Sequence, residues 1–139
     1  MSVLLDTSFV IALRNQRDEH HARAAALFKE LLEHRHGHMH ATNLVFSETV
    51  TTAFARTRRH SSAVAAGEVF LLQHGGRPLV RMHHLTGPQL LSAWDEFRRY
   101  RDKKLSMVDW TSVVVARELE VDHVLSFDEE FDGILPRLS

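Results

Sequence analysis

The sequence contains no cysteine, and only three prolines and six glycines occur among its 139 residues. Without cysteine, the chain can form neither a disulfide framework nor a thiolate-based site. Hydrophobic residues make up 44% of the chain and charged residues 25%, which excludes a disordered or collagen-like protein. This length and composition predict one globular domain over residues 1–139, and the lack of cysteine suits a reducing compartment, the cytoplasm.

Long hydrophobic runs and an excess of positive charge are also missing. The most apolar stretch, MSVLLDTSFVIAL, has no basic leader and is interrupted by Asp6, so we expect neither a signal peptide nor a membrane anchor. The formal net charge is −1, but RTRRH (56–60) and FRRYRDKK (97–104) are strongly basic. The overall charge therefore does not exclude a polyanionic partner such as RNA.

Short apolar runs alternate with longer amphipathic segments along the whole chain. The runs predict buried strands at 2–6, 38–42, 78–82 and 122–128. The segments between them predict helices at 7–15, 18–35, 44–59, 62–74, 86–100 and 106–116, with glycines at 37 and 75–76 as helix stops. The caps predicted for the later helices are Thr42 or Asn43, Thr86, and Ser106 with Asp109; Ser126 with Glu129 repeats the capping pattern. This alternation predicts an α/β fold whose parallel sheet is covered on both faces.

Four acidic residues fall at one edge of this predicted sheet. Asp6 ends the first strand, and Asp128 lies next to the end of the last one. Glu48 lies in the second turn of the helix after the second strand, and Asp109 in the first turn of its helix. In open α/β sheets, ligands bind beyond the carboxyl ends of the strands, so we expect these carboxylates to share a site.

Asp109 is the most informative of the four acids because the helix around it, SMVDWTSVVVA, is apolar on most sides. A buried carboxylate is costly unless it is paired, hydrogen-bonded or bound to a metal. Taken singly, Asp109 or Asp128 could serve only as an acid at a helix N-terminus, and Glu48 only as a solvated helix residue. Gathered carboxylates repel one another, and a hard divalent cation such as Mg²⁺ resolves that repulsion. This chemistry indicates metal-assisted phosphoryl transfer.

The same residues lie in four ordered stretches that resemble the PIN-domain ribonucleases, and most of all the VapC-type toxins of bacterial toxin–antitoxin pairs. The stretches are LLDTSFVIAL, FSETVTTAFAR, LSMVDWTSVVVAREL and VLSFDEEFD, and the resemblance extends from about Val3 to Leu135. It implies a three-layer α/β/α PIN-like fold and an endoribonuclease that depends on Mg²⁺, with Mn²⁺ able to substitute. It also implies a homodimer that a cognate antitoxin holds inactive.

The resemblance assigns the catalytic acids to Asp6, Glu48, Asp109 and Asp128. It implies that three of them, Asp6, Asp109 and Asp128, bind the metal, whereas Asp132 could substitute for Asp128 or assist it. The hydroxyls of Thr7 and Ser8 stand beside Asp6 in the sequence, where they can orient a carboxylate or a bound water.

Other polar motifs leave two interpretations open. Arg98, Arg99 and Arg101 could contact the RNA backbone or could simply be solvated at a helix end. The alternating histidines of HRHGHMH, His34 to His40, could begin a metal site, but no third or fourth ligand has matching spacing, which favours scattered surface histidines. Trp94 and Trp110 are predicted core residues.

Two other functions are compatible with the sequence. A PIN-like domain stabilised by metal could act as a non-catalytic binding or scaffold module, although a scaffold does not need these four acids. A phosphomonoesterase would use similar metal chemistry on a small substrate. The sequence identifies neither the RNA that is cut nor the antitoxin.

Overall fold

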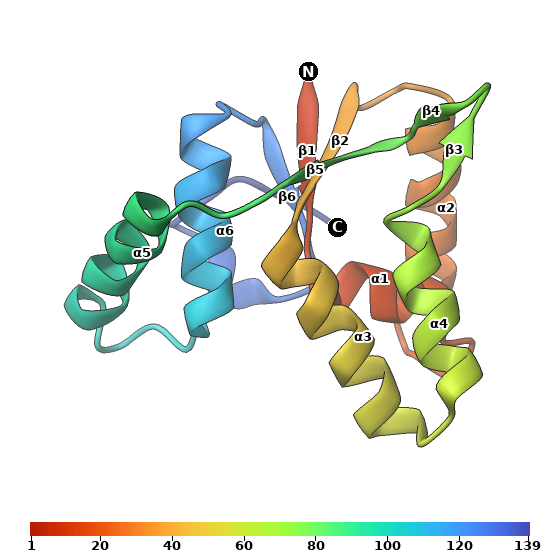
Figure 1. Cartoon of the computed structure of the whole chain (residues 1–139), viewed down its shortest axis with the longest axis horizontal. Coiled ribbons are helices and arrows are strands. Elements are labelled where there is room, and N and C mark those ends of the chain that lie inside the picture. The colour runs from red at the N-terminus through yellow and green to blue at the C-terminus, as the bar shows by residue number, and fades with distance from the viewer.

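The computed structural model describes residues 1–139 and has a five-stranded parallel sheet at its centre (Figure 1). The strand order is β5 (Val80–His83), β2 (His38–Thr42), β1 (Ser2–Leu5), β6 (His123–Leu125) and β7 (Arg137–Leu138). All neighbouring strands run parallel. The predicted α/β fold with a short parallel sheet is therefore confirmed.

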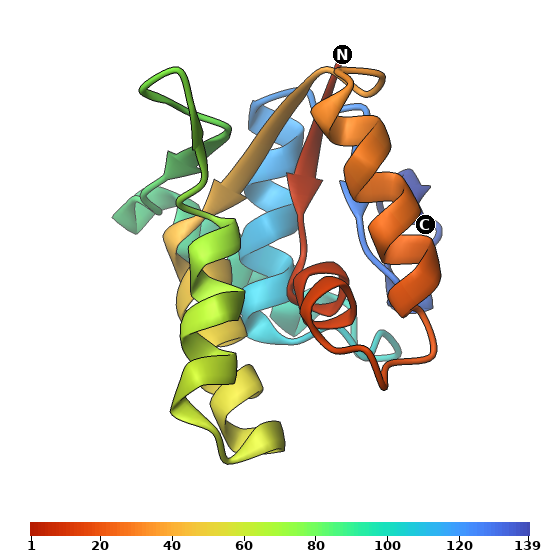
Figure 2. The ribbon, with the colours of Figure 1, turned by 90° about the vertical axis from the view of Figure 1, so that its right-hand side faces the viewer.

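Six α-helices surround the sheet and complete the three layers. They are α1 (Thr7–Arg14), α2 (His21–Leu32), α3 (Asn43–Thr57), α4 (His60–Val69), α5 (Gly87–Arg99) and α6 (Met107–Glu118). Helices α5 and α6 lie on one side of the sheet, and α1, α2 and α4 lie on the other (Figures 1 and 2). In Figure 1, α1 and the first turns of α3 and α6 lie around the lower end of the sheet, where β1 ends.

The central strands are apolar on both faces because helices cover both faces. In β1, Val3 and Leu5 pack into the core shared with α1 to α4, whereas Leu4 packs against α6. Trp110 is fully buried on α6, as predicted. The core prediction for Trp94 is wrong: this side chain is 47% exposed on α5.

A small antiparallel hairpin replaces the end of the helix predicted at 62–74. Helix α4 ends at Val69, and β3 (Gln73–His74) pairs with β4 (Arg77–Pro78). Gly75 and Gly76 form the turn with φ of 59° and 76°. Two positive φ angles in a two-residue loop match the right-handed twist of a hairpin, so the glycines close a turn and do not end a helix.

The chain after β6 also differs from prediction. The strand predicted at 122–128 ends at Leu125, because the next residue, Ser126, turns its hydroxyl toward Asp6. Asp128 caps a short 3₁₀ helix, η1 (Glu129–Phe131), in place of the predicted Ser126–Glu129 cap. The terminal strand β7 was not predicted, because a strand of two residues shows no recognisable pattern in the sequence. Of the helices, none is long and apolar enough to cross a membrane.

Candidate active site

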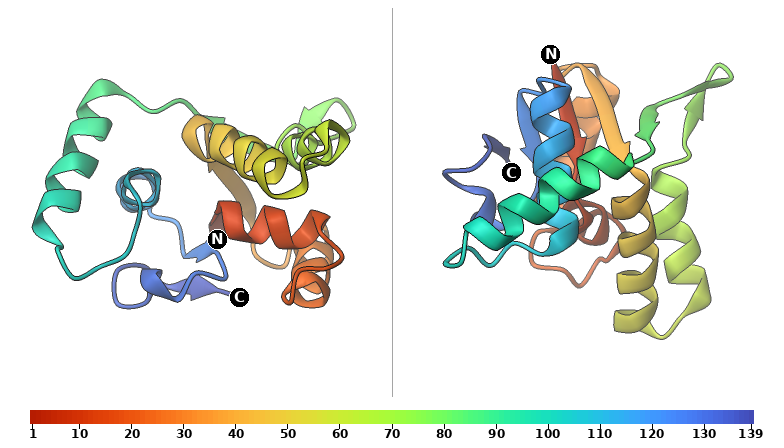
Figure 3. Two further views of the ribbon diagram at one scale, coloured as in Figure 1. Left: turned by 90° about the horizontal axis from the view of Figure 1, so that it is seen from below. Right: turned by 60° about the vertical axis from the view of Figure 1, so that its left-hand side comes forward.

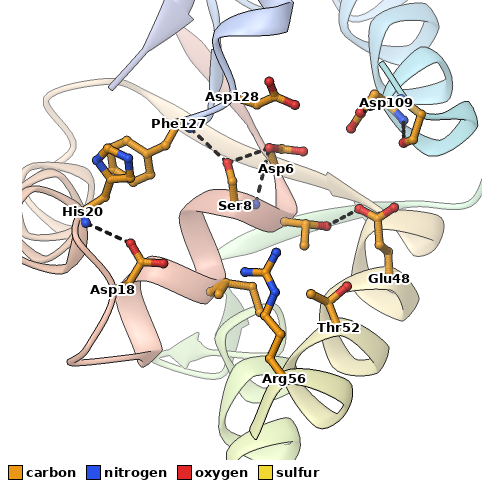
Figure 4. Close-up of a pocket in the computed structure, with 13 residues that line it drawn as sticks. Asp6, Ser8, Asp18, His20, Glu48, Thr52, Arg56, Asp109, Phe127 and Asp128 are labelled. Atoms are coloured by element: carbon orange, nitrogen blue, oxygen red, sulfur yellow. Dashed lines mark hydrogen bonds between the residues drawn. The ribbon is translucent and has the colours of Figure 1, made fainter. Parts of the chain in front are cut away.

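The four predicted acids line one cavity of about 420 Å³ at the carboxyl edge of the sheet (Figure 4). They come from four different parts of the fold. Asp6 caps α1, Glu48 lies on α3, Asp109 lies in the first turn of α6, and Asp128 follows β6. The cavity thus joins residues from both ends of the chain.

Asp6 is the most rigidly held of these carboxylates and is only 3% exposed. Its Oδ2 accepts hydrogen bonds from the hydroxyls of Ser8 (2.8 Å) and Ser126 (2.7 Å), and the backbone N–H of Ser8 lies 3.4 Å away. Burial raises the pKa of Asp6 above the usual value, and the serine hydrogen bonds oppose this effect. The two serines therefore fix the position of a carboxylate that water reaches poorly.

Glu48 is positioned by hydroxyls of α1 and α3. Thr7 donates to Oε1 of Glu48 at 2.6 Å, and Thr49 donates to Thr7 at 3.1 Å. Glu48 faces the cavity because the apolar stripe of α3 points in another direction; Val45 and Ala53 are buried there. Thr7 thus connects the first turn of α1 to the acid on α3.

Asp109 forms the capping box of α6 with Ser106, as the sequence predicts. Its Oδ2 accepts from the Ser106 backbone N–H at 2.8 Å, and its own N–H donates to the Ser106 hydroxyl at 3.1 Å. Burial raises the pKa of Asp109 to about 7, and the negative charges of Asp6 and Glu48 add to the rise. Asp109 therefore faces other carboxylates, not a basic partner.

Asp128 and Asp132 have different surroundings. Asp128 lines the acidic cavity, and its Oδ1 accepts from the backbone N–H of Glu130 at 3.0 Å. Asp132 lies outside the cavity and is exposed. Both of its oxygens accept from Arg137, at 2.9 and 3.2 Å, and this hydrogen bonding lowers the pKa of Asp132. Arg137 therefore already neutralises Asp132.

Each of the four cavity acids is held through one oxygen and leaves the other without a protein hydrogen bond. The free oxygens are Oδ1 of Asp6, Oε2 of Glu48, Oδ1 of Asp109 and Oδ2 of Asp128. None of them belongs to the buried polar atoms that lack a partner. The site therefore presents four oriented oxygens to solvent in the cavity.

This donor set fits a hard divalent cation, because it consists of carboxylate oxygens, and because burial and then the charges of Asp6 and Glu48 raise the pKa of Asp109. The acids do not form a closed cage: no three of them lie close enough to contact one ion directly. The assignment of Asp6, Asp109 and Asp128 as metal ligands stays a prediction. The open arrangement of the acids suits Mg²⁺, which takes one or two carboxylates directly and keeps several waters.

The cavity also contains side chains that the sequence did not indicate as site residues. They are Asp18, His20, Thr52 and Arg56. Thr52 and Arg56 follow Glu48 at intervals of four residues, so helical spacing could have placed them on the same face of α3. Asp18 and His20 precede α2 in a turn, where no periodic pattern points to the site. The ring of His20 stacks on Phe127 with centroids 4.4 Å apart.

The basic run at the end of α5 lies outside the acidic cavity. Arg98, Arg99 and Arg101 are exposed, and none of them lines the cavity. Arg98 donates to Asp95 at 3.3 Å and lies over the ring of Trp94. Figure 3 shows the end of α5 on the far side of α6 from α1 and α3.

One histidine of the histidine-rich segment is buried and pairs with a histidine of the neighbouring strand β5. His40 on β2 is buried, and its Nδ1 lies 2.8 Å from Nε2 of His83 on β5. Burial lowers the pKa of His40 to about 4, and repulsion by His83 in its protonated form and by Arg81 adds to this effect. His38 is exposed at the start of the same strand. The pair therefore forms a hydrogen bond between neutral rings.

Comparisons with known proteins show what the whole chain is similar to. The PIN-domain family model matches residues 3–134. The chain is 32% identical over 131 residues to the 23S rRNA-specific endonuclease VapC20 of Mycobacterium tuberculosis, which covers 94% of this chain and 92% of VapC20. The crystal structure of VapC20, described as a sarcin–ricin loop cleaving toxin, matches with a TM-score of 0.82 and 30% identity. That structural match covers 94% of this chain and 93% of the VapC20 chain.

Proposed function

The chain belongs to the PIN-domain family, a family of nucleases, and on this premise we propose a metal-dependent endoribonuclease that acts as the toxin of a type II toxin–antitoxin system. The observation that carries this proposal is the acidic cavity, where four carboxylates each offer one free oxygen. The named activity of VapC20 makes 23S ribosomal RNA the first substrate to test.

In this proposal, Asp6, Asp109 and Asp128 would hold Mg²⁺ through their free oxygens. A bound Mg²⁺, or Mn²⁺ in its place, polarises the scissile phosphate and lowers the pKa of an attacking water. Glu48, held by Thr7, offers its free oxygen to a water in the cavity. Ser8 keeps Asp6 in place, so that its free oxygen points to the same space.

Because the pKa of Asp109 is high, metal binding should release a proton from this residue. With a pKa of about 7, Asp109 is about half protonated at neutral pH when no cation is bound. A cation that binds at its oxygen must displace this proton. Mg²⁺ affinity should therefore rise as the pH increases through 7.

We also propose that the protein is a homodimer and that a cognate antitoxin holds it inactive. We propose a cytoplasmic location as well, because an RNA-cleaving toxin acts where its RNA is found. Light scattering of the purified protein would measure the dimer. An antitoxin gene should lie next to the gene for this chain, and its product should inhibit cleavage when it is added in equal amount.

The central experiment is a cleavage assay on ribosomal and total cellular RNA, with Mg²⁺ or with EDTA. Asp6→Asn and Asp109→Asn should each nearly abolish cleavage while the fold remains intact, because each removes one charge that holds the cation. Asp102→Asn, the same chemical change at an exposed residue outside the cavity, is the matched control. If both cavity variants keep more than about a tenth of the wild-type rate at saturating Mg²⁺, the chemistry lies elsewhere.

The same assay separates the two alternative functions. A non-catalytic scaffold would bind RNA or protein without Mg²⁺-dependent cleavage. A phosphomonoesterase would release the alcohol from a small chromogenic phosphate ester at a rate that the Asp109→Asn change abolishes. The proposal expects cleavage of RNA and no turnover of the small ester.

A further inference from the structure

A second polar cavity opens beside the acidic one and has the opposite charge. We name it the arginine hollow; its volume is about 430 Å³. Its lining residues are Asn15, Gln16, Arg17, Arg56, Thr57, Arg59 and Ser62. None of these residues is acidic or hydrophobic. Arg56, which Figure 4 labels among the residues of the acidic cavity, also lines the arginine hollow, so the two cavities are neighbours.

The three arginines of the hollow have no carboxylate partner. The ion pairs of the protein involve other residues, and no side-chain hydrogen bond engages the guanidinium groups of Arg17, Arg56 or Arg59. All three side chains are exposed. Three free guanidinium groups around one polar space form an anion site, because each can present a planar fork of donors to a phosphate.

Two short hydrogen-bonded loops hold the arginine hollow open. Oδ1 of Asn15 accepts from the backbone N–H of Arg17 at 3.0 Å. On the other side, the Thr57 hydroxyl donates to the Ala53 carbonyl at 2.7 Å and accepts from the Arg59 N–H at 3.2 Å. In both loops a polar side chain fixes the backbone of an arginine, so the cost of ordering the site on binding is reduced.

Arg59 does not stabilise the start of helix α4. It occupies the N-cap of α4 and makes no side-chain capping bond there. Ser, Thr, Asp or Asn is preferred at this position, and a positive charge is unfavourable at a helix N-terminus. The same dipole favours an anion near Ser62, which lies in the first turn of α4. The position of Arg59 is therefore better explained by a bound anion than by helix stability.

The negative charge of the acidic cavity explains why an anion site is needed beside it. Asp18 adds a fifth carboxylate to the four acids that line it, and Arg56 is the only arginine or lysine among its lining residues. An RNA strand approaching these carboxylates is repelled unless a neighbouring phosphate is neutralised. The arginine hollow lies in the right place, since it continues from the acidic cavity along α3.

We propose that the arginine hollow binds a backbone phosphate of the RNA, next to the scissile phosphate, and so fixes the direction in which the strand crosses the acids. Arg17 and Arg59 hold this neighbouring phosphate, and Arg56 lies between it and the scissile one. This inference rests on the proposed function, because the ligand is the same RNA.

The test uses the Arg17→Gln/Arg59→Gln variant and a short single-stranded RNA that carries a cleavage site mapped with the wild type. Binding is measured in the inactive Asp109→Asn protein, and the KM of cleavage in the active one. The dissociation constant and KM should each rise on the order of tenfold, as expected when a charge-assisted hydrogen bond to phosphate is removed. The slope of log Kd against log salt should fall by about 0.7 for each phosphate that the variant no longer neutralises.

The matched control is Arg77→Gln/Arg81→Gln, which removes the same charge from exposed residues of β4 and β5, outside both cavities. It should bind and cleave as the wild type does. Thermal melts of both double variants show whether the fold is intact, and Arg17→Lys/Arg59→Lys provides a second variant that keeps the charge but loses the planar forks. We expect the lysine variant to recover only part of the affinity.

A chemical double-mutant cycle identifies the phosphate itself. RNAs that carry one neutral methylphosphonate at successive positions are bound to the wild-type hollow and to the glutamine variant. One position next to the scissile phosphate should weaken binding to the wild-type hollow and have no further effect on the variant. The inference fails if the wild type cleaves RNA but the variant keeps its affinity, or if every methylphosphonate acts equally on both. If the wild type cleaves no RNA, the proposed function itself is wrong.

Discussion

Asp109 serves the fold and the site with different oxygens. Its Oδ2 closes the capping box with Ser106, and its Oδ1 remains free in the acidic cavity. An asparagine can retain the accepting oxygen of the cap but removes the charge that Asp6 repels. An alanine loses both. Substitutions at this one position can therefore separate a structural role from a metal-binding role.

We predict opposite effects of Asp109→Asn on stability with and without metal. In EDTA, the variant should melt at or above the wild-type temperature, because one charge is removed from a cluster of carboxylates. With Mg²⁺ the order should reverse, since the wild type gains stability from a ligand that the unfolded chain does not bind. The measurement is a thermal melt in each condition, at fixed ionic strength and neutral pH.

Asp109→Ala is the control for this experiment. It should be less stable than Asp109→Asn by about 0.5–1.5 kcal/mol in EDTA, the usual net contribution of one hydrogen bond, because it loses the bond to the Ser106 backbone N–H. A clear destabilisation by Asp109→Asn in EDTA would instead mean that its carboxylate is needed for the fold, and that the repulsion inferred from its pKa is small.

A second prediction concerns the fourth acid. Asp128→Asn should reduce cleavage more than Asp132→Asn, because Asp128 lines the acidic cavity and Asp132 is bound to Arg137. Rates at saturating Mg²⁺ on the same RNA provide the comparison. The opposite ranking would move the fourth catalytic position from Asp128 to Asp132.

At the scale of elements, helix starts and strand ends carry most of the information that the sequence contains about the site. The capping box of α6 and the acid after β1 were predicted because both depend on neighbouring residues. The hairpin after α4 was not, because Gly75-Gly76 is equally suited to a helix stop and a turn. Strand β7 is too short to show a period, and it is defined by its pairing with β6.

Interactions between distant segments explain what was missed around the site. Ser126 holds Asp6 across 120 positions of the chain, and local patterns do not encode that hydrogen bond. Arg56 was visible only as part of a basic run. Its position in the acidic cavity follows from the direction of α3, which the packing of α3 against α1 and α4 determines.

A third prediction concerns the contribution of the basic end of α5 to RNA binding. Replacing Arg98, Arg99 and Arg101 together by glutamine should flatten the salt dependence of RNA binding, because fewer counterions are released. The effect on cleavage at saturating RNA should be small, since these residues lie outside the acidic cavity. An unchanged salt slope, measured by titration at several salt concentrations, would assign this run to solvation alone.

For the whole molecule, the titrations of His40 and Asp109 act on stability in opposite directions. The pKa of His40 is lowered to about 4, so the unfolded chain binds the proton more readily between pH 6.5 and 4. Stability from His40 is therefore lost as the pH falls through this range. The pKa of Asp109 is raised to about 7, so the metal-free folded state gains stability as the pH falls from 7 toward 4.

Removing either group should reveal the contribution of the other. In EDTA between pH 7 and pH 5, Asp109→Asn should lose stability on acidification, and His40→Gln should gain it. The wild type should lie between them. Since one pKa unit corresponds to about 1.4 kcal/mol, the two variants should diverge by on the order of 2 kcal/mol or more. Urea unfolding at each pH measures this, and parallel pH profiles would contradict the assignment.

The hydrogen bond between Asp6 and Ser126 also has a consequence for synthesis. Asp6 leaves the ribosome first, but the serine that holds it and Asp128 are among the last residues to be translated. A nascent chain without its C-terminal segment therefore lacks both a supporting hydroxyl and one of the four acids. The acidic site is therefore complete only after β6 has joined β1 in the sheet, when the last part of the chain has left the ribosome.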